Sequence, residues 1–421
     1  MISKLFFKST LTPIQSATRF WFMSLFIFFL LNILSRESDL TQLFKFIYPL
    51  LVILPLYFFT KLFNNKLFAY FLFFSISITS VLGFTESLTG AYAEPVTPVL
   101  FGMSFYTAAL GYYIIKNKFT KANILYAINP LIIISGPIAI NIKDISYKKF
   151  STRANYFIPY IILGLFLNQA ISTPMTETFF LISEVDAISA ILFAIIFELF
   201  VYANFCGISL IIFGLSGLLG YKVPLNFKQP FSASNLRDFW KGWHVTLSEV
   251  LKTLFYNPIK KKFNTTLAAL FVFFVSAMWH GVSINFLIWG IFHGTCLVCT
   301  IFFLKKDFKI IPIFLMIFGL VFGRMIFADS DFGRLILKLQ MNFTDLNAIY
   351  EILNLSKVTL LSLIFMVLFV TCEFVFKNNK YFIGKNYKFY RLPYVRELLL
   401  ILTFLMISSN LGVDYAVYGQ R

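Results

Sequence analysis

Charged residues are scarce in this chain. Asp, Glu, Lys and Arg make up 13% of its 421 residues, about half the share in a soluble globular domain. Hydrophobic residues reach 59%, and 56 Phe help to bring the aromatic share to 19%, more than a water-exposed surface could hold. A polar linker that would separate domains is also lacking. Composition therefore excludes a cytosolic enzyme and predicts one polytopic membrane domain over residues 1–421.

Acidic residues are fewer than basic ones, 19 against 36, which gives a formal net charge of +17. The basic residues stand in short runs between apolar stretches, as they do in cytoplasmic loops, so we do not expect nucleic-acid binding. Cysteine is also rare, with four residues. Cys296 and Cys299 form a CxxC, but no second pair or adjacent polar ligand accompanies it. We therefore expect no metal site and interpret these cysteines as small apolar residues that pack between helices.

Apolar segments long enough to cross a bilayer recur along the chain, since a crossing helix needs about 20 mostly apolar residues. They predict an all-α membrane protein with roughly eleven transmembrane helices. Basic and acidic loops alternate in a way that places the N-terminus inside, and we expect a multi-pass protein of the bacterial cytoplasmic membrane. The candidate spans lie near 19–35, 44–60, 67–84, 97–115, 122–141, 155–171, 186–220, 265–280, 283–303, 310–327, 358–376 and 396–412.

Two of these segments differ from ordinary crossings. The loops on both sides of 122–141 are basic, while Pro130 and Pro137 interrupt any helix there. We predict that this segment is re-entrant, and a kinked span with one misplaced basic loop is the alternative. The stretch 186–220 is too long for one crossing and holds four Gly. It predicts a span followed by a second piece that is tilted or re-entrant.

The region 221–264 is the longest polar connection, and it is basic and amphipathic. We expect it on the cytoplasmic surface. It contains His244, flanked by Trp240 and Trp243. A histidine there could take part in proton transfer or could anchor the helix at the membrane interface, and both interpretations stay open.

The other two histidines, His280 and His293, belong to apolar segments. His280 stands at the break between two of them, where a helix end can open a cavity, so we predict a functional role in proton transfer. His293 lies deep in the next span and is expected to be a neutral histidine hydrogen-bonded across helices. Glu198 also falls inside a span, so we expect it to pair with a base or to orient a histidine.

Several motifs follow one another in an order that is specific. Residues 226–231 read NFKQPF and residues 239–248 read FWKGWHVTLS, while residues 278–294 read MWHGVSINFLIWGIFHG and 136–138 read GPI. This set, over about 120 to 300, resembles the signature region of the membrane-bound O-acyltransferase family, in its alginate and peptidoglycan O-acetyltransferase branch. The chain departs from that family at Asn204, Cys206 and Leu210, where the family has Asp, Ser and Asp.

The resemblance implies a membrane acyltransferase with His280 as the catalytic base and His244 as the second characteristic histidine. It would move an acyl group, expected to be acetyl, from a cytoplasmic thioester such as acetyl-CoA across the bilayer to hydroxyls of an extracytoplasmic glycan. No bound cofactor is expected, and the partner would be an extracytoplasmic acetyltransferase. A D-alanyl transferase acting on teichoic acid and a non-enzymatic transporter or flippase are the alternatives. We expect the cavity to be lined by Trp279, Trp243, Trp240, Glu198 and Asn285.

The sequence ends in AVYGQR, which is loosely similar to the aromatic-rich terminal motif Phe-Ile-Tyr-Phe-x-Phe of some proteins in these systems. Tyr418 matches the Tyr of that motif, whereas the flanking aromatic residues are replaced. Tyr418 is therefore a possible acyl carrier. A phenol is a weak nucleophile at its usual pKa of about 10, so a base such as His280 would have to deprotonate it. The alternative is a frayed polar tail without chemistry.

Overall fold

The computed structural model is helical over most of the residues that it describes. Within them, the only strands are two-residue segments that pair antiparallel, Lys143 with Lys222 and Asp144 with Tyr221. The structure describes residues 11–34, 66–74, 93–133, 136–181, 187–281, 283–328, 333, 335–337 and 347–409.

The helices vary widely in length, and several are interrupted by short turns of other geometry. Lys252–Tyr256 and Phe166–Ser172 are π-helical, while Pro230–Ser232 and Phe389–Arg391 are 3₁₀ turns. The elements are α2 (Pro13–Leu34), α4 (Lys66–Phe73), α7 (Ala93–Ile115), α8 (Lys121–Ala127), α9 (Pro130–Ile133), β1 (Lys143–Asp144), α10 (Phe150–Leu165), α11 (Thr173–Met175), α12 (Thr178–Leu181), α13 (Ala187–Leu219), β2 (Tyr221–Lys222), α14 (Leu236–Gly242), α15 (Val245–Leu251), α16 (Asn257–Lys262), α17 (Thr265–His280), α18 (Ile284–Lys305), α19 (Ile310–Phe327), α21 (Asn347–Leu353), α22 (Lys357–Val375) and α23 (Pro393–Ser409).

Five helical segments among the described residues are long and apolar enough to cross a membrane. Helix α17 is apolar but shorter. The predicted all-α, multi-pass class is confirmed, whereas the count of roughly eleven crossings stays a prediction. The five segments are Phe150–Met175, Ile188–Leu219, Ile284–Lys305, Ile310–Phe327 and Lys357–Val375.

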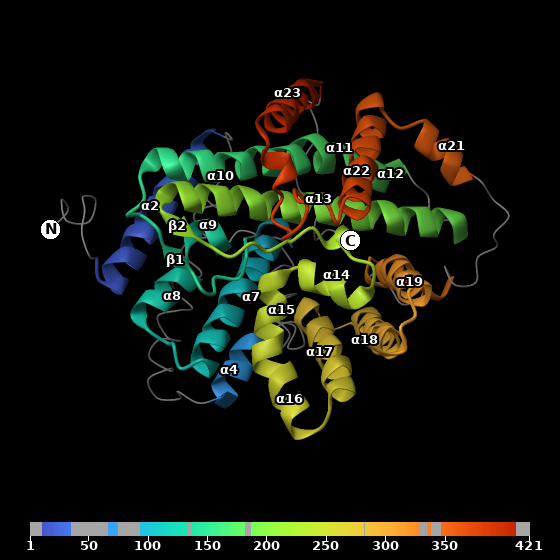
Figure 1. Ribbon diagram of the computed structural model, residues 1–421, viewed down its shortest axis with the longest axis horizontal. Coiled ribbons are helices and arrows are strands. Elements are labelled where there is room, and N and C mark those ends of the chain that lie inside the picture. The colour runs from blue at the N-terminus through green and yellow to red at the C-terminus, as the bar shows by residue number, and fades with distance from the viewer. Residues whose placement is uncertain are drawn as a thin grey trace.

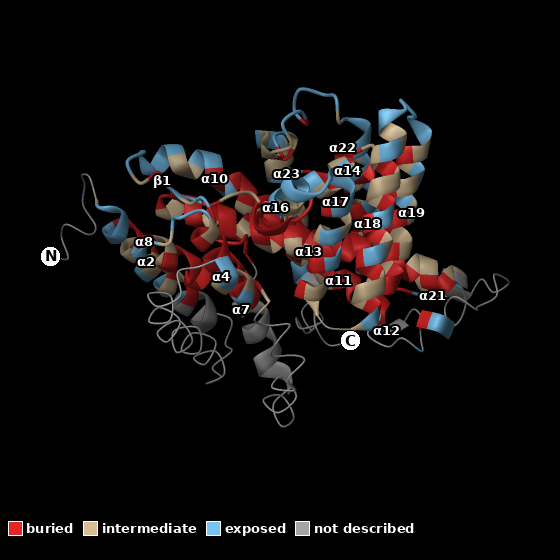
Figure 2. Cartoon of the chain, turned by 90° about the horizontal axis from the view of Figure 1, so that it is seen from below, coloured by how far each residue is buried: buried red, intermediate tan, exposed pale blue. Residues whose placement is uncertain are grey.

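Helices α10 and α13 lie side by side along the long axis of the molecule, and α18 and α19 are seen nearly end on in the same view (Figure 1). α13 carries mostly buried residues, whereas α19 shows exposed ones (Figure 2). In the apolar window of α13 61% of residues are buried, against 28% in that of α19. α13 is therefore a central helix, and the apolar surface of α19 faces outward as expected for lipid contact.

The predicted break within 186–220 is wrong, because α13 is one continuous helix of 33 residues. Its glycines allow close packing instead of interrupting the helix. A Cβ at Gly207 would lie 2.8 Å from the backbone nitrogen of Asn168, and one at Gly217 would overlap the ring of Phe157. The helix ends at Leu219, directly before Gly220, whose φ is +97°. At 1.5 Å per residue, such a helix is about 50 Å long and exceeds the hydrocarbon core of about 30 Å, so it must be tilted or project from the bilayer.

The segment 122–141 leaves and returns at the same end of α7. Its helices α8 and α9 have seven and four residues, too few to cross a bilayer. The hydroxyl of Tyr113 donates a hydrogen bond to the carbonyl of Ala139 at 2.6 Å, and Asn141 donates to the hydroxyl of Tyr112 at 3.3 Å. Both tyrosines belong to the last turn of α7, from which the chain also enters α8. Whether the segment is re-entrant or a kinked span stays a prediction.

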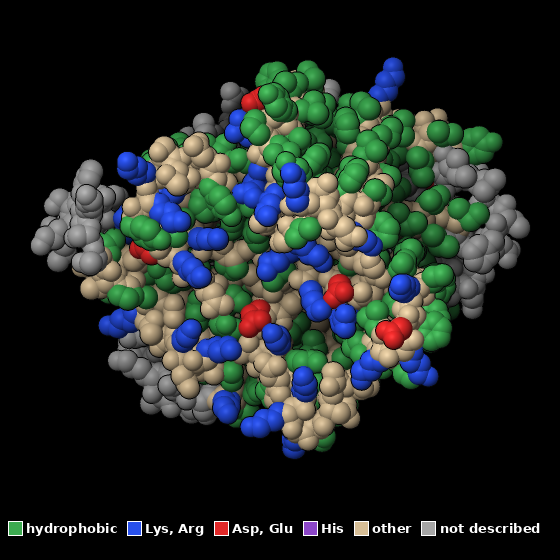
Figure 3. Space-filling model, viewed as in Figure 1, with side chains coloured by type: hydrophobic (Ala, Val, Ile, Leu, Met, Phe, Trp, Pro, Cys, Tyr) green, Lys and Arg blue, Asp and Glu red, His purple; other side chains and the backbone are tan. Residues whose placement is uncertain are grey.

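The amphipathic character predicted for 221–264 is visible in the fold. Leu236, Phe239 and Trp243 are buried, while Lys and Arg side chains are spread over the face that carries α14, α15 and α16 (Figure 3). The connection therefore packs its apolar side onto the helical core and leaves its basic side exposed. Its cytoplasmic location remains a prediction from the charge of the loops.

Candidate functional site

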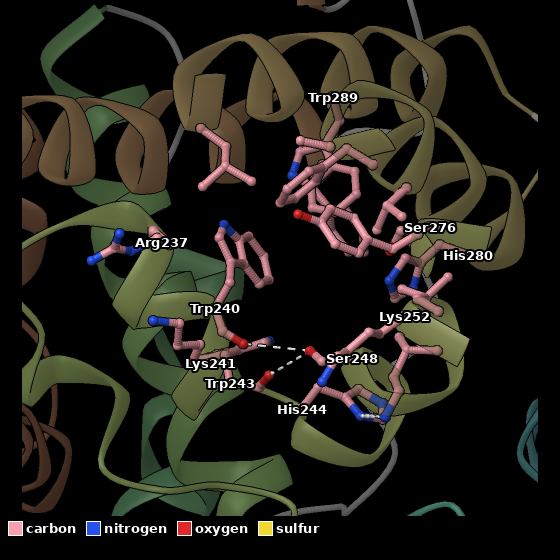
Figure 4. Close-up of a pocket in the computed structure, with 18 of the residues that line it drawn as sticks. Arg237, Trp240, Lys241, Trp243, His244, Ser248, Lys252, Ser276, His280 and Trp289 are labelled. Carbon is pink, nitrogen blue, oxygen red and sulfur yellow. Dashed lines mark hydrogen bonds between the residues drawn. The ribbon is translucent and has the colours of Figure 1, made fainter. Parts of the chain in front are cut away.

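A cavity of about 360 Å³ lies between the α14–α15 connection and helices α17, α18 and α19. His244 and His280, which are on different elements, both line it (Figure 4). Trp240, Trp243 and Trp289 are among its aromatic lining residues. The cavity therefore combines two titratable groups with an apolar wall, as binding sites for small ligands commonly do.

His244 is held in an unusual backbone conformation. It is the N-cap of α15, and its φ of 41° and ψ of 55° place it in the left-handed region, which non-glycine residues seldom occupy and which is enriched at functional sites. Its Nδ1 accepts a hydrogen bond from the backbone N–H of Leu247 at 3.4 Å. A neutral imidazole that accepts at Nδ1 carries its proton on Nε2. That Nε2 is buried and has no hydrogen-bond partner within the described residues.

Polar groups of two other segments fix the turn that follows His244. The backbone N–H of Val245 donates to the carbonyl of Asn226 at 2.7 Å, and the hydroxyl of Thr246 donates to the side-chain oxygen of Asn226 at 2.7 Å. The same hydroxyl accepts from the backbone N–H of Ile138 at 2.9 Å. The segment 122–141 and the NFKQPF motif thus meet at the turn after His244, Val245–Thr246.

His280 is the last residue of α17, and Gly281 caps that helix. Its imidazole is partly exposed and makes no hydrogen bond to the described residues. Aromatic rings surround it, with centroids at 5.0 Å for Trp279, 5.1 Å for Phe327 and 5.9 Å for Trp289. The nitrogen atoms of His280 are therefore free to exchange a proton with a ligand in the cavity.

His293 is buried among rings and is not part of the cavity wall. Its ring centroid lies 4.9 Å from that of Trp289, 5.3 Å from that of Trp240 and 5.8 Å from that of Phe273. Its Nδ1 has no hydrogen-bond partner within the described residues. Among the described residues, the expected hydrogen bond from His293 across helices is not observed. His293 instead packs against Trp240 and Trp289, which line the cavity.

Glu198 has the basic partner that its position inside a span required. Its Oε2 accepts a hydrogen bond from Nε of Arg324 at 2.5 Å, and the two side chains are 8% and 10% exposed. Arg324 lines the cavity, and its guanidinium carbon lies 5.0 Å from the centre of the Phe327 ring. Glu198 itself is not on the cavity wall. The pair therefore presents its positive end to the site.

The mouth of the cavity is basic. Arg237, Lys241 and Lys252 line it, and all three side chains are well exposed. Arg237 and Lys241 pair with Asp238, at 3.5 and 2.7 Å, and Lys252 pairs with Glu249 at 3.8 Å. Partial burial disfavours the charged form of Asp238, but hydrogen bonds from Lys241 and Asn235 outweigh it and lower its pKa to about 2. Exposed pairs of this kind are weak, so an anionic ligand could replace the carboxylates.

Some of the remaining predicted site residues line the cavity and others do not. Trp240 and Trp243 line the cavity. Trp279, whose ring centroid lies 5.0 Å from that of His280, and Asn285, which is buried in the first turn of α18, are not among the lining residues. Tyr418 lies outside the described residues. The positions of these side chains do not test their predicted roles, which remain proposals.

A buried polar cluster near the site escaped the sequence analysis. The hydroxyl of Tyr202 donates to Oε1 of Glu373 at 2.9 Å and lies 3.2 Å from the hydroxyl of Tyr387, which in turn lies 3.3 Å from the sulfur of Cys206. The ring of Tyr202 is 5.8 Å from that of Trp243. The cluster thus joins α13 to α22 and contacts Trp243, the residue before His244. Its sequence signal was a carboxylate, Glu373, within the candidate span 358–376.

Comparisons with known proteins agree with this arrangement. Residues 152–306 match the model of the MBOAT, membrane-bound O-acyltransferase family. A peptidoglycan O-acetyltransferase of Helicobacter pylori is 29% identical over 182 residues, which cover 39% of this chain and 34% of that protein. The "probable alginate O-acetylase AlgI" of Azotobacter vinelandii is 27% identical over 37% of this chain and 32% of its own length. A teichoic acid D-alanyltransferase of Bacillus subtilis is 29% identical over 28% of this chain and 33% of its own length.

The matched segments thus span about a third of the length of these relatives. The family model covers most of α10, then α13 and the elements from α14 to α18, which carry both cavity histidines. The resemblance inferred from the ordered motifs is confirmed. Residues 152–306 of this chain are thus similar to the membrane-bound O-acyltransferase family.

Proposed function

We propose that this protein is a membrane O-acyltransferase that moves an acyl group, in the first instance acetyl, from a cytoplasmic thioester to hydroxyls of an extracytoplasmic glycan. The observation that carries the proposal is that His244 and His280 line one cavity. The cavity has a basic mouth and an aromatic wall, which suits a thioester whose carrier is anionic. Relatives that are named O-acetyltransferases support the acetyl group.

His280 is the proposed general base. Transfer to a hydroxyl requires that the hydroxyl lose its proton as its oxygen attacks the thioester carbonyl, and an imidazole without a hydrogen bond can accept that proton. The carbon–sulfur bond then breaks, and the proton passes to the departing thiolate. The aromatic rings beside His280 leave its partly exposed imidazole open to the cavity, where an acceptor hydroxyl could reach it.

His244 is the proposed hydrogen-bond donor to the thioester carbonyl. Its Nδ1 is occupied by the N–H of Leu247, so the neutral ring offers an N–H at Nε2, and that atom has no partner among the described residues. Buried donors are normally satisfied, so a ligand atom is the natural partner. A donor that is already fixed in place stabilises the oxyanion of the tetrahedral intermediate without reorganisation.

The donor would enter from the side of Arg237, Lys241 and Lys252. Coenzyme A carries phosphates that these cations would attract, and no resident cofactor is needed for the reaction. The same cations could receive an acidic carrier protein. An extracytoplasmic partner acetyltransferase would collect the acyl group, and Tyr418 remains a proposed carrier for that step.

A D-alanyl transferase is the second candidate, because a teichoic acid D-alanyltransferase of Streptococcus thermophilus is 34% identical over 121 residues of this chain. The two functions share the base and the oxyanion donor and differ in the acyl group. Mass spectrometry of the surface glycans of the host, with and without this gene, would identify the group that is transferred.

The mechanism itself is tested with His280→Gln, which keeps a polar side chain of similar size but removes the base. We expect acyl transfer in membranes to fall by about 10²–10⁴-fold, with thermal stability in detergent close to that of wild type. Cys299→Ser on α18, outside the cavity wall, is the matched control and should retain full activity. Undiminished transfer by the His280 variant would refute the assignment of the base.

A further inference from the structure

The charge of the cavity wall selects the acyl group. Arg324 is one of four cationic side chains that line the cavity in the described residues, with Arg237, Lys241 and Lys252, and the lining includes no Asp or Glu. We propose, on the basis of the proposed acyltransferase function, that Arg324 is a specificity-determining residue that admits uncharged acyl groups and rejects aminoacyl groups, which carry an ammonium.

The positive charge of Arg324 has one carboxylate partner among the described residues. A guanidinium is not deprotonated in proteins, and Glu198 compensates it through Nε alone. Its two Nη groups make no hydrogen bond within the described residues. Because Arg324 lines the cavity and Glu198 does not, the positive end of the ion pair is the end that a ligand meets.

The guanidinium also lies close to the proposed reaction centre. The ring of Phe327 has the guanidinium carbon of Arg324 5.0 Å from its centre and the ring of His280 at 5.1 Å. Arg324 and His280 thus share one aromatic neighbour. An acyl group placed for attack beside His280 would bring the substituent on its α-carbon into the field of Arg324.

The size of the effect follows from simple electrostatics. Two like charges about 6 Å apart, at an effective dielectric constant of about 20, repel strongly enough to change an equilibrium about 100-fold. The mouth cations add to this field, and their own carboxylate partners, Asp238 and Glu249, do not line the cavity. An ammonium would also lose its hydration without gaining an anionic partner on the wall. An acetyl group is uncharged, so it has neither the repulsion by these cations nor the loss of ammonium hydration to overcome.

The experiment compares two acyl groups of nearly equal shape. Isobutyryl-CoA and D-alanyl-CoA differ by a methyl group in place of an ammonium. Both are offered to the protein in membranes of the host, which retain the extracytoplasmic partner and the envelope glycan that serves as the acceptor. Acetyl-CoA serves as the reference donor. We expect isobutyryl transfer to exceed D-alanyl transfer by about 100-fold in kcat/KM.

The variants remove the charge without leaving Glu198 unpaired. Glu198→Gln with Arg324→Gln replaces the ion pair by two amides and should reduce the preference to less than about 10-fold, whereas Arg324→Lys should retain it. Arg396→Gln, on the distant helix α23, is the matched control and should leave the preference unchanged. The wild-type comparison remains decisive even if the double variant does not fold.

Two results would overturn the inference in different ways. D-alanyl transfer by the wild-type protein within fivefold of isobutyryl transfer would refute charge selection while leaving the acyltransferase function intact. Transfer of none of the three groups, either from coenzyme A or from a carrier-protein thioester, would overturn the proposed function itself and the inference with it.

Discussion

A methyl group added at Gly323 provides a direct test of the packing that supports the site. A Cβ at this position of α19 would lie 2.1 Å from Nε2 of His293, far inside van der Waals contact. His293 cannot easily swing away, because it is 2% exposed and has the rings of Trp240, Trp289 and Phe273 around it. Such overpacking costs about 1–3 kcal/mol. We therefore expect Gly323→Ala to lower the free energy of unfolding by that amount.

The same helix offers a matched control one turn away. A Cβ at Gly319 would lie 3.4 Å from the nearest atom, a methyl group of Leu236, which is an ordinary contact. Gly319→Ala should be neutral or stabilising by up to about 1 kcal/mol, since alanine favours the helix. The assay is unfolding of the two variants and wild type in the same detergent. Equal stability of the two variants would refute the reasoning.

A double-mutant cycle identifies His293 as the cause. His293→Ala removes the ring that the new methyl group would strike, so Gly323→Ala should be tolerated in that background and the coupling should be about 1–3 kcal/mol. Acyl transfer by Gly323→Ala should fall as well, because Trp240 and Trp289 line the cavity and pack on His293. Additive losses of stability would show that the clash lies elsewhere.

Three further predictions concern other parts of the chain. Cys296→Ser combined with Cys299→Ser should leave activity largely intact, and no metal should copurify; stoichiometric zinc that the substitutions remove would contradict this. At Glu177, partial burial disfavours the charge, but hydrogen bonds from Thr359 and Ser356 lower the pKa of the carboxyl below its usual value. The stability that the charged Glu177 carboxylate contributes is therefore complete above the unfolded pKa of about 4.3 and is lost as pH falls through the lower folded pKa. Glu177→Gln should remove that part of the dependence of stability on acid. Measurements of unfolding between pH 3 and pH 7 on wild type and variant would test this. Tyr418→Phe should impair glycan modification if the phenol carries the acyl group, and full modification by this variant would end that idea.

The sequence predicts the class of protein and the main chemical groups, because these depend on composition and local pattern. Scarce charge and long apolar runs indicate a membrane bundle, and Pro130 with the Gly136-Pro137 pair indicates the interrupted segment that returns to α7. His280 at a helix break is likewise visible without coordinates. In each case the signal lies within about 20 consecutive residues, the length of one crossing helix.

The errors and omissions share a different cause, which is dependence on packing between distant segments. Glycine can break a helix or allow another helix to approach, and the sequence of 186–220 does not distinguish these until α10 is placed against Gly214 and Gly217. The partner of Glu198 lies 126 positions further along the chain. Glu373 was missed because its interactions with Tyr202 depend on how α22 packs against α13.

The site is assembled where regular secondary structure stops. His244 occupies a left-handed N-cap, His280 is the last residue of a helix, and Ile138 belongs to the interrupted segment 122–141. Irregular backbone is tolerated at membrane depth only where protein or a cavity surrounds it and its polar groups are satisfied. Here Asn226 and Thr246 satisfy the groups around His244, while the Nε2 of that histidine has no described partner. Because the neighbouring backbone groups are already paired, a ligand in the cavity would meet the Nε2 of His244 and the imidazole of His280, and under the proposed function these groups supply the donor and the base that acyl transfer requires.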